Sequence, residues 1–313
     1  MVADRKPAVV IVGLGGGLGN QLFQYAFGRR MALANQASLQ IDASGYEHVG
    51  TPNTAIGERT LSLDHFHITG TLIRHADTAR RPQAWLRRKL IKHWNRLIAV
   101  LERRKPYYLR REVWEPEENH FKFDRHLFER RVAGSVVFHG YWQTEKYFLE
   151  IESELRRELV VEDALQGANL QLGRQIEGHE AVALHVRHGD NAGTAAGLGV
   201  LPFDYYQTAI RELKRDVHDP HLFVFSDDMD WAKSLIVSDL PTVFVSHNDA
   251  TTDYEDLRLM SKCKHHVLAN STFSWWGAWL GKKPGQIVYA PRRYYQNVDR
   301  PNPDLYPESW RLL

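Results

Sequence analysis

The sequence is short of cysteine, of long apolar runs and of net charge. Its 313 residues include one cysteine, Cys263, so no intramolecular disulfide can form, and we expect a reducing compartment or a fold that needs no cross-links. No stretch of about twenty apolar residues occurs, and the apolar run 8–12 is too short for a signal peptide. The net charge of +2 gives no reason to expect a nucleic acid as a partner. We therefore predict a cytoplasmic protein without a membrane span.

The chain is rich, by contrast, in alternating strand and helix patterns. Hydrophobic residues make up 43% and charged residues 25% of the chain, which is the balance of a globular protein with ample core. Short apolar runs predict buried strands, and periodic segments between them predict helices. The predicted strands are 7–12, 38–41, 132–138, 181–186, 222–225, 242–245, 266–268 and 286–289, and the predicted helices are 22–34, 144–159, 203–216, 229–237, 253–263 and 273–280. This repetition predicts parallel, doubly wound sheets of the α/β class.

The length suits two domains, which we place at 1–162 and 163–313. In the first, a glycine-rich turn between a strand and a helix forms a backbone cradle for an anion. A dinucleotide site is the rival, but the G-x-G-x-x-G spacing fails, because Leu18, Asn20 and Leu22 occupy the possible third-glycine positions. Glycines that serve only a tight turn remain the plainer alternative.

Polar side chains cluster at the end of the predicted strand 181–186. His185, Arg187, His188 and Asp190 stand there, where open α/β sheets bind their ligands. The planar guanidinium suits a phosphate or a carboxylate, although a salt bridge at a strand end is an equally ordinary role for an arginine.

Right-handed crossovers would bring further polar residues to the same edge of the sheet. These are Ser226, Asp227, Asp228, His247, Asn270, Ser271 and Thr272. The last three form a strong N-cap signal before the helix 273–280, and the free N–H groups of such a helix also favour a pyrophosphate. Asp228 and Asp230 are spaced like the D-x-D metal pair of a different class of sugar transferase. Because Arg187 and a helix N-terminus can neutralise a diphosphate, we predict that no metal is required.

Two other segments leave alternatives open. The strand end at 139–143 places the aromatic pair Tyr141 and Trp142 beside Gln143, which suits sugar recognition and suits a corner of the core nearly as well. The segment 82–105 is predicted to form a basic amphipathic helix. This helix either binds peripherally to the inner face of an anionic membrane or packs its apolar stripe on the core, which is the commoner role.

Five blocks of the chain, in the same order, resemble the α-1,2-fucosyltransferases of glycosyltransferase family 11. The blocks are GGLGNQLFQYA at 16–26, GYWQTEKYF at 140–148, HVRHGD at 185–190, FVFSDD at 223–228 and NSTFSWWGAW at 270–279. The resemblance implies a GT-B architecture, with two Rossmann-like domains facing across a cleft. It also implies inverting transfer of L-fucose from GDP-β-L-fucose to the 2-hydroxyl of an oligosaccharide or glycan acceptor, a β-galactoside.

The resemblance also assigns residues. It implies that His185 and Arg187 bind the β-phosphate, that Asp227 and the turn 271–275 hold the nucleotide, and that the loop 17–21 faces the fucose and the acceptor. We therefore expect the donor to contact Gly17, Gly19, His185, Arg187, Ser226, Asp227, Asp228, Asn270, Ser271, Thr272, Phe273, Ser274 and Trp275, the acceptor to contact Gln21, Trp142 and Gln143, and catalysis to use Arg187, Asn20 and His185. No general base is evident. Asn20 or Gln21 could orient the acceptor hydroxyl, but neither is a useful base.

One departure from the family pattern concerns His188, which stands where the family has a second arginine. Histidine loses its charge near neutrality, so this departure predicts weaker or pH-dependent donor binding. Two rival functions remain: an NAD-dependent oxidoreductase that uses the N-terminal glycines, and a sugar-binding module without catalysis that uses the aromatic residues.

Overall fold

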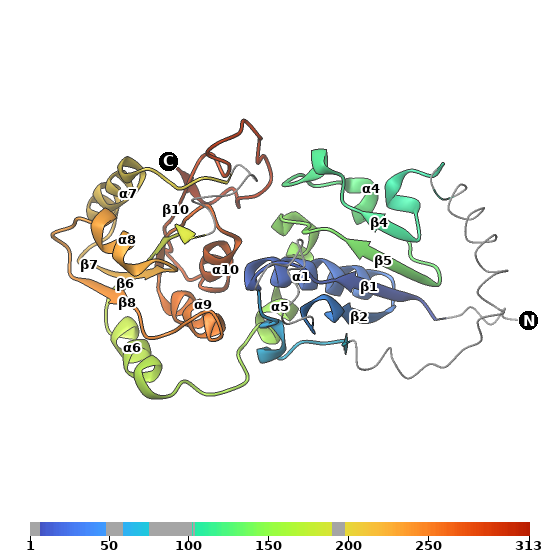
Figure 1. Ribbon diagram of the computed structural model, residues 1–313, viewed down its shortest axis with the longest axis horizontal. Helices are drawn as coiled ribbons and strands as arrows, with labels where there is room; N and C mark the ends of the chain where they lie inside the picture. Colours follow the sequence, from blue (N-terminus) through green and yellow to red (C-terminus); the bar gives the residue numbers. More distant parts are fainter. Residues whose placement is uncertain (1–6, 48–58, 75–101, 103, 190–197) are drawn as a thin grey trace, which may run out of the picture. The chain divides into compact units, whose positions relative to one another are not determined.

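The structure of this protein, a computed structural model, consists of two compact units (Figure 1). It describes residues 7–47, 59–74, 102, 104–189 and 198–313. Unit 1 comprises Met1–Leu61 and Ile68–Leu155, and unit 2 comprises Ser62–His67 and Arg156–Leu313. The chain thus enters unit 2 at Arg156, and unit 2 also takes a short piece of the N-terminal half, in which Phe66 forms an antiparallel bridge with Val161.

Unit 1 is built on a five-stranded sheet with the strand order β3-β2-β1-β5-β4. Its strands are β1 (Val9–Gly13), β2 (Ser38–Asp42), β3 (Thr71–Ile73), β4 (Glu112–Trp114) and β5 (Ser135–His139). All neighbouring strands pair in parallel, so their carboxyl ends share one edge. Gly13, Asp42, Trp114 and His139, each the last residue of its strand, stand at that edge.

Alternation along these strands buries one face of the sheet under helix α1 (Leu18–Ala34). Val10 and Val12 of β1 are 0% and 1% exposed, whereas the residues between them are only partly buried. A Cβ atom on Gly28 of α1 would lie 2.4 Å from Cγ1 of Val12, so the helix approaches the strand more closely than an alanine would allow.

Unit 2 is built on a six-stranded sheet with the order β11-β10-β9-β6-β7-β8 (Figure 1). Its strands are β6 (Glu180–Val186), β7 (Pro220–Ser226), β8 (Thr242–Val245), β9 (His265–Val267), β10 (Val288–Ala290) and β11 (Arg311–Leu312). All of them pair in parallel, and β6 lies between β7 and β9. The segments that leave β6, β7 and β9 therefore start from neighbouring points of one edge.

Helices cover both faces of this second sheet. They are α6 (Gly167–Glu177), α7 (Phe203–Asp216), α8 (Met229–Leu235), α9 (Asp253–Lys262) and α10 (Thr272–Leu280). Val182 and Leu184 of β6 join one apolar cluster with residues of α7 and α8, and Ala181 and Ala183 join another with residues of α6 and α9. The prediction of a doubly wound parallel sheet is confirmed here, since neighbouring residues of β6 are buried on opposite faces.

Two predictions about helices were wrong. The segment 144–159 is not one helix. It forms the short 3-10 turns η5 (Glu145–Tyr147) and η6 (Leu149–Ile151), and only α5 (Glu152–Glu158) is α-helical. The Thr144 hydroxyl accepts the N–H of Lys146 at 3.3 Å and closes a tight turn instead. Helix α6 was not predicted, because its sequence is largely polar.

The predicted basic helix 82–105 lies, apart from residues 102, 104 and 105, outside the described residues. In the described part of unit 1, the remaining helices are η1 (Ser44–Glu47), η3 (Tyr107–Leu109), η4 (Glu117–Asn119) and α4 (Arg125–Phe128), while η2 (Leu63–His65) belongs to unit 2. None of the helices that the structure describes has both the length and the apolar character needed to cross a membrane.

Candidate active site

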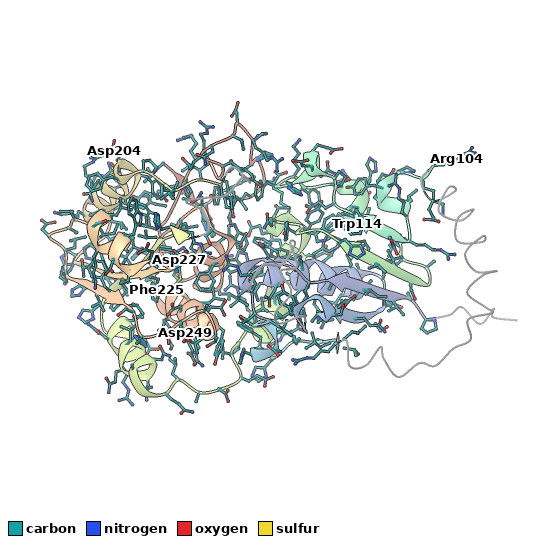
Figure 2. The ribbon with its side chains drawn as sticks, in the orientation of Figure 1. Arg104, Trp114, Asp204, Phe225, Asp227 and Asp249 are labelled. Atoms are coloured by element: carbon teal, nitrogen blue, oxygen red, sulfur yellow. The ribbon has the colours of Figure 1, made fainter. Side chains whose placement is uncertain are left out.

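The carboxyl edge of the unit 2 sheet carries an ion pair. Arg187 directly follows β6 and places its Nη1 atom 3.2 Å from Oδ2 of Asp227. Asp227 follows β7 and is labelled in Figure 2. The other carboxylate oxygen of Asp227 accepts the backbone N–H of His188 at 3.0 Å. A Cβ atom on Gly189 would stand 2.4 Å from Oδ2 of Asp227, so only glycine allows this close approach. The Arg187 side chain is 19% exposed.

His188 lies beside this pair and is held by α8. Its Nδ1 atom is 2.8 Å from Oδ2 of Asp228, and its ring stacks on Trp231 with centroids 4.4 Å apart. Asp228 is also the N-cap of α8 and accepts the N–H of Trp231 at 3.0 Å. The Trp231 N–H, followed by His188, lowers the pKa of the Asp228 carboxyl. Asp228 therefore caps the N-terminus of α8 in this structure.

His185 is an inward-facing residue near the end of β6. It is 3% exposed, and burial, followed by the charge of Arg187, lowers its pKa to about 3. The imidazole is thus neutral at physiological pH. Among the residues that the structure describes, none forms a hydrogen bond with its Nδ1 atom. Leaving a buried polar atom unpaired costs about 1–3 kcal/mol, and a bound ligand could remove this cost.

Helix α10 begins after the neighbouring strand β9 with an open N-terminus. Ser271 is its N-cap and accepts the N–H of Phe273 at 3.3 Å. Its first turn, which starts at Thr272, contains no acidic residue that would occupy the remaining N–H groups. An N-terminus of this kind attracts anions through its free N–H groups and its dipole.

Asn270 holds the surrounding loops together. Its Nδ2 atom lies within 3.1 Å of three carbonyl oxygens, those of Leu198, Gly199 and Tyr294, and the residue is 2% exposed. Ser226 is engaged in a similar way, because its hydroxyl bonds both the carbonyl oxygen and the N–H of Asp228, at 2.9 and 3.0 Å. Their side chains position the edge, and direct donor contacts by them remain predictions.

Ser274 and Trp275 are inside the unit. They are 0% and 1% exposed, and Nε1 of Trp275 donates to the carbonyl oxygen of Leu305 at 2.8 Å. Phe273 packs against the apolar cluster on that side of the sheet, and its ring centroid is 5.7 Å from that of His185. The predicted side-chain contacts of Ser274 and Trp275 with a donor find no support here, because neither side chain reaches the surface. Only their backbone remains to act at the helix start.

In unit 1 the glycine-rich loop is tied down by two glutamines. The Gly15 N–H donates to Oε1 of Gln24 at 3.0 Å, and Nε2 of Gln24 donates to the Gly140 carbonyl oxygen at 3.0 Å. Nε2 of Gln21 donates to the carbonyl oxygens of Gly16 at 3.2 Å and Thr60 at 2.8 Å. Because Gln21 is 0% exposed, its predicted contact with an acceptor finds no support, and its role in this structure is to shape the loop.

Two of the predicted unit 1 residues do meet. Oδ1 of Asn20 accepts a hydrogen bond from Nε2 of Gln143 at 2.9 Å, across the ends of β1 and β5. Gly16 has a φ of +80°, a left-handed conformation that favours glycine. Gly17 is the N-cap of α1 and has no side chain to cap it, while Gly19 is buried in the first turn. The loop thus places Asn20, which is partly exposed, and Gln143, which is 8% exposed, at the N-terminus of α1.

The turn after β5 depends on Glu115, which the sequence analysis did not single out. Its carboxylate accepts the N–H groups of Tyr141 at 2.7 Å and Trp142 at 3.3 Å. Its side chain is 3% exposed, and this burial raises its pKa to about 7 although both N–H groups act in the opposite direction. A Cβ atom on Gly140 would lie 2.4 Å from Cβ of Glu115, so the turn packs tightly against the carboxylate.

Trp142 was expected to stack on a sugar, and this expectation needs correction. Its φ of 54° turns the side chain inward, where the indole is 1% exposed and stacks on Phe27 with centroids 4.6 Å apart. The indole therefore has no free face for an acceptor. Of the two alternatives that the sequence left open, the corner of the core is the one observed.

Neither unit contains a recognisable metal centre in its described part. Among those residues, no three His, Cys, Asp or Glu side chains are grouped as a metal ion would require. Asp190, which the sequence placed at the unit 2 edge, lies outside the described residues.

Comparison with known proteins identifies the family. The model of Glycosyl transferase family 11 matches residues 113–311. An alpha-1,2-colitosyltransferase of Escherichia coli is 31% identical over 97% of this chain and 98% of its own length. The chain belongs to glycosyltransferase family 11. It is thus a glycosyltransferase of the fucosyltransferase kind.

Other members and neighbours of family 11 agree with this assignment. Galactoside alpha-(1,2)-fucosyltransferase 1 of Homo sapiens is 26% identical over 52% of this chain and 48% of its own length. The crystal structure of NodZ alpha-1,6-fucosyltransferase soaked with GDP-fucose superposes with a TM-score of 0.50 at 18% identity, and covers 88% of this chain and 93% of NodZ. That likeness concerns the fold alone. Together with the two parallel α/β units, it shows a GT-B-like fold.

Three site residues escaped the sequence analysis of this family 11 protein. Gln24 and Glu115 act through hydrogen bonds to backbone groups distant in sequence, and no local pattern signals such bonds. Trp114 ends β4, a strand of three residues that is too short to show alternation. For Gln24 the sequence does contain a signal, because a polar amide stands there on an otherwise apolar helix within the block 16–26.

Proposed function

We propose that this family 11 enzyme transfers L-fucose from GDP-β-L-fucose to the 2-hydroxyl of a β-galactoside, with inversion, to form an α-1,2 linkage. The observation that carries the proposal is the set of groups at the unit 2 edge that can bind a diphosphate. These are the Arg187 guanidinium, the unpartnered buried Nδ1 of His185 and the open N-terminus of α10. They offer hydrogen-bond donors and positive potential, and both nearby carboxylates have protein partners, because Asp227 pairs with Arg187 and Asp228 caps α8.

The chemistry that these residues would promote is a displacement at C1 of the fucose. The bond between C1 and the β-phosphate oxygen breaks, and the acceptor oxygen forms a bond to C1 from the opposite side and loses its proton. Negative charge develops on the departing GDP, where Arg187 and the α10 N-terminus can stabilise it. His185 contributes a neutral hydrogen bond, because its depressed pKa prevents it from carrying charge.

Unit 1 suits the uncharged partner of this reaction. Its loop presents amide groups and backbone N–H groups, and Asn20 with Gln143 could orient the attacking hydroxyl through hydrogen bonds. Glu115 is an unsuitable general base, since it is 3% exposed and already accepts two backbone N–H groups. A transition state with much dissociative character would need only a weak base.

A second GDP-sugar should be tested as the donor substrate. The relative that matches 97% of the chain is named a colitosyltransferase, and colitose is L-fucose without its 3-hydroxyl. Both sugars would leave the same GDP, so the unit 2 groups named above fit either donor. The choice between them depends on what meets the 3-hydroxyl position.

The experiment that tests the proposal measures GDP release from GDP-fucose and from GDP-colitose against a panel of β-galactosides. We expect acceptor-dependent release, with NMR of the product giving an α-1,2 linkage. Release from GDP-colitose alone would replace the donor and keep the reaction. Absence of acceptor-dependent release from both donors would reject the proposal, and a change in nicotinamide absorbance with candidate substrates would favour the oxidoreductase rival.

A further inference from the structure

Trp114 is an exposed tryptophan in a protein that buries most of its large aromatic side chains. Trp142, Trp275 and Trp276 are at most 1% exposed, whereas Trp114 is 63% exposed. It ends β4, and Figure 2 shows it beside the strands of unit 1. Leaving an indole in water forgoes roughly 2–3 kcal/mol of burial. A single exposed indole is common on protein surfaces, but this one stands at the carboxyl edge of a parallel sheet, where such sheets bind their ligands, and that position points to a binding role.

The indole is held rigidly from one side. Trp114 is the register partner of His139, the last residue of β5, and their rings stack with centroids 4.1 Å apart and an interplanar angle of 17°. His139 in turn lies over β1, since a Cβ atom on Gly13 would be 3.1 Å from its Nδ1. Three adjacent strand ends thus support one aromatic platform. One face of the indole rests on the imidazole, and the opposite side accounts for its exposure.

The charge around this platform selects the kind of ligand. Burial lowers the pKa of His139, while the carboxylates of Glu112 and Asp42 act weakly in the opposite direction. The imidazole is therefore neutral at physiological pH, and the charged groups near it are acidic. Such surroundings repel phosphates and other anions. They suit hydroxyl groups, which donate to carboxylates, and C–H groups, which prefer the negative face of an aromatic ring.

We infer that the stacked Trp114–His139 pair is a binding subsite for a pyranose ring of the acceptor glycan. The inference rests on the proposed function and extends it. β4 is two strands away from β1, so the platform lies roughly 10 Å across the sheet from the strand that leads into the glycine-rich loop. That separation assigns it to a sugar residue next to the reacting galactoside. A single indole is also far smaller than the roughly 1,000 Å² that a stable protein interface needs.

The test compares acceptors of two lengths with three variants. The acceptors are methyl β-galactoside and a disaccharide in which the same galactose is β-linked to N-acetylglucosamine. The variants are Trp114→Ala, Trp114→Phe and, as a matched control, Leu149→Ala, which shortens a 47% exposed side chain of the same unit. Thermal unfolding of each variant checks that the fold is intact.

Trp114→Ala is expected to raise the KM for the disaccharide roughly tenfold, the effect of losing a stacking contact. The values for methyl β-galactoside, for the donor and for kcat should stay within about twofold of the unchanged protein. Trp114→Phe should recover most of the loss, and Leu149→Ala should have no effect. Equal losses with both acceptors, no loss with either, or a change in oligomeric state on removing the indole would overturn the inference.

A binding measurement separates this inference from the proposed function. The disaccharide is titrated into the protein with GDP present, and the heat of binding is measured by calorimetry for the unchanged protein and for Trp114→Ala. Binding that depends on Trp114, without transfer from either GDP-sugar, would reject the proposed function and keep the subsite. Transfer that proceeds equally well in Trp114→Ala on every acceptor would keep the function and reject the subsite.

Discussion

The two parallel sheets of this protein have carboxyl edges of opposite character. The unit 2 edge is built from ions: Arg187 pairs with Asp227 at 3.2 Å, and His188 bonds Asp228 at 2.8 Å. The unit 1 edge is built mostly from amides and backbone groups, in which Gln21, Gln24 and the pair of Asn20 with Gln143 hold two loops together. Of the carboxylates at that edge, Glu115 is buried and Asp42 accepts the N–H of Ser44 at 3.0 Å.

This difference indicates which edge suits which substrate. A diphosphate needs fixed positive charge, and paired acids keep that charge in place while leaving part of it exposed. A sugar hydroxyl needs directional hydrogen bonds, which the amide and backbone groups of the unit 1 edge can supply. Family 11 membership requires both kinds of substrate, and the two units divide that requirement between them in our proposal.

Arg187→Ala tests the charged edge and should have the largest effect. We expect kcat/KM for the donor to fall roughly a hundredfold to a thousandfold, because the developing charge on GDP loses its guanidinium partner. Arg187→Lys keeps the charge but loses the planar guanidinium, so its kcat/KM should lie between the values of the unchanged protein and of Arg187→Ala. Near-normal turnover of a folded Arg187→Ala protein would remove the charged edge from the reaction.

Glu115→Gln tests the buried carboxylate of the neutral edge. Its pKa of about 7 in the folded protein exceeds the ordinary 4.5, so between these values the unfolded chain releases a proton that the folded protein keeps. The free energy of unfolding should therefore fall as the pH rises from 4.5 to about 7, by about 3 kcal/mol, and stay level above pH 7.

Urea unfolding from pH 4.5 to 8 measures this effect as the difference between the unchanged protein and Glu115→Gln. The glutamine should abolish the decline, whereas Glu118→Gln, on the exposed surface of the same segment, should leave it unchanged. If the two variants follow the same curve, Glu115 is ionised in the folded protein at all these pH values.

His188→Arg tests the same edge by placing a permanent cation beside Arg187. The KM for the GDP-sugar should fall roughly threefold, because a guanidinium at this partly exposed position adds a fixed charge near the diphosphate, provided that the stack on Trp231 survives. A KM that is the same in both proteins would mean that His188 serves only to hold α8.

Chelation should have the smallest effect. We expect transfer to continue within about twofold after EDTA treatment and dialysis, because Arg187 and the α10 dipole neutralise the diphosphate. Loss of activity that Mn²⁺ or Mg²⁺ restores would show that the unit 2 edge needs a cation to neutralise the diphosphate. Asp228 and Asp230 would then be the candidate metal ligands.

Much of unit 2 could be predicted from the sequence because its elements are locally marked. The helix 203–216 and the strand 242–245 have the predicted bounds, since Pro202 precedes the helix, and Pro241 and Ser246 flank the strand. The helix predicted for 144–159 was wrong because its apolar residues, Tyr147 and Phe148 among them, are buried by the packing of short turns and not by one face of a helix.

Short-range patterns and the order of motifs along the chain are enough to assign the family, the parallel α/β class and the polar residues at the strand ends. Which of those residues are available to a ligand depends on the three-dimensional packing. It buried Trp142 and exposed Trp114, it engaged Asn270 and Gln21 in loop contacts, and it left His185 neutral. Exposure and protonation depend on neighbours that the fold brings together from distant positions, and no local pattern carries that information.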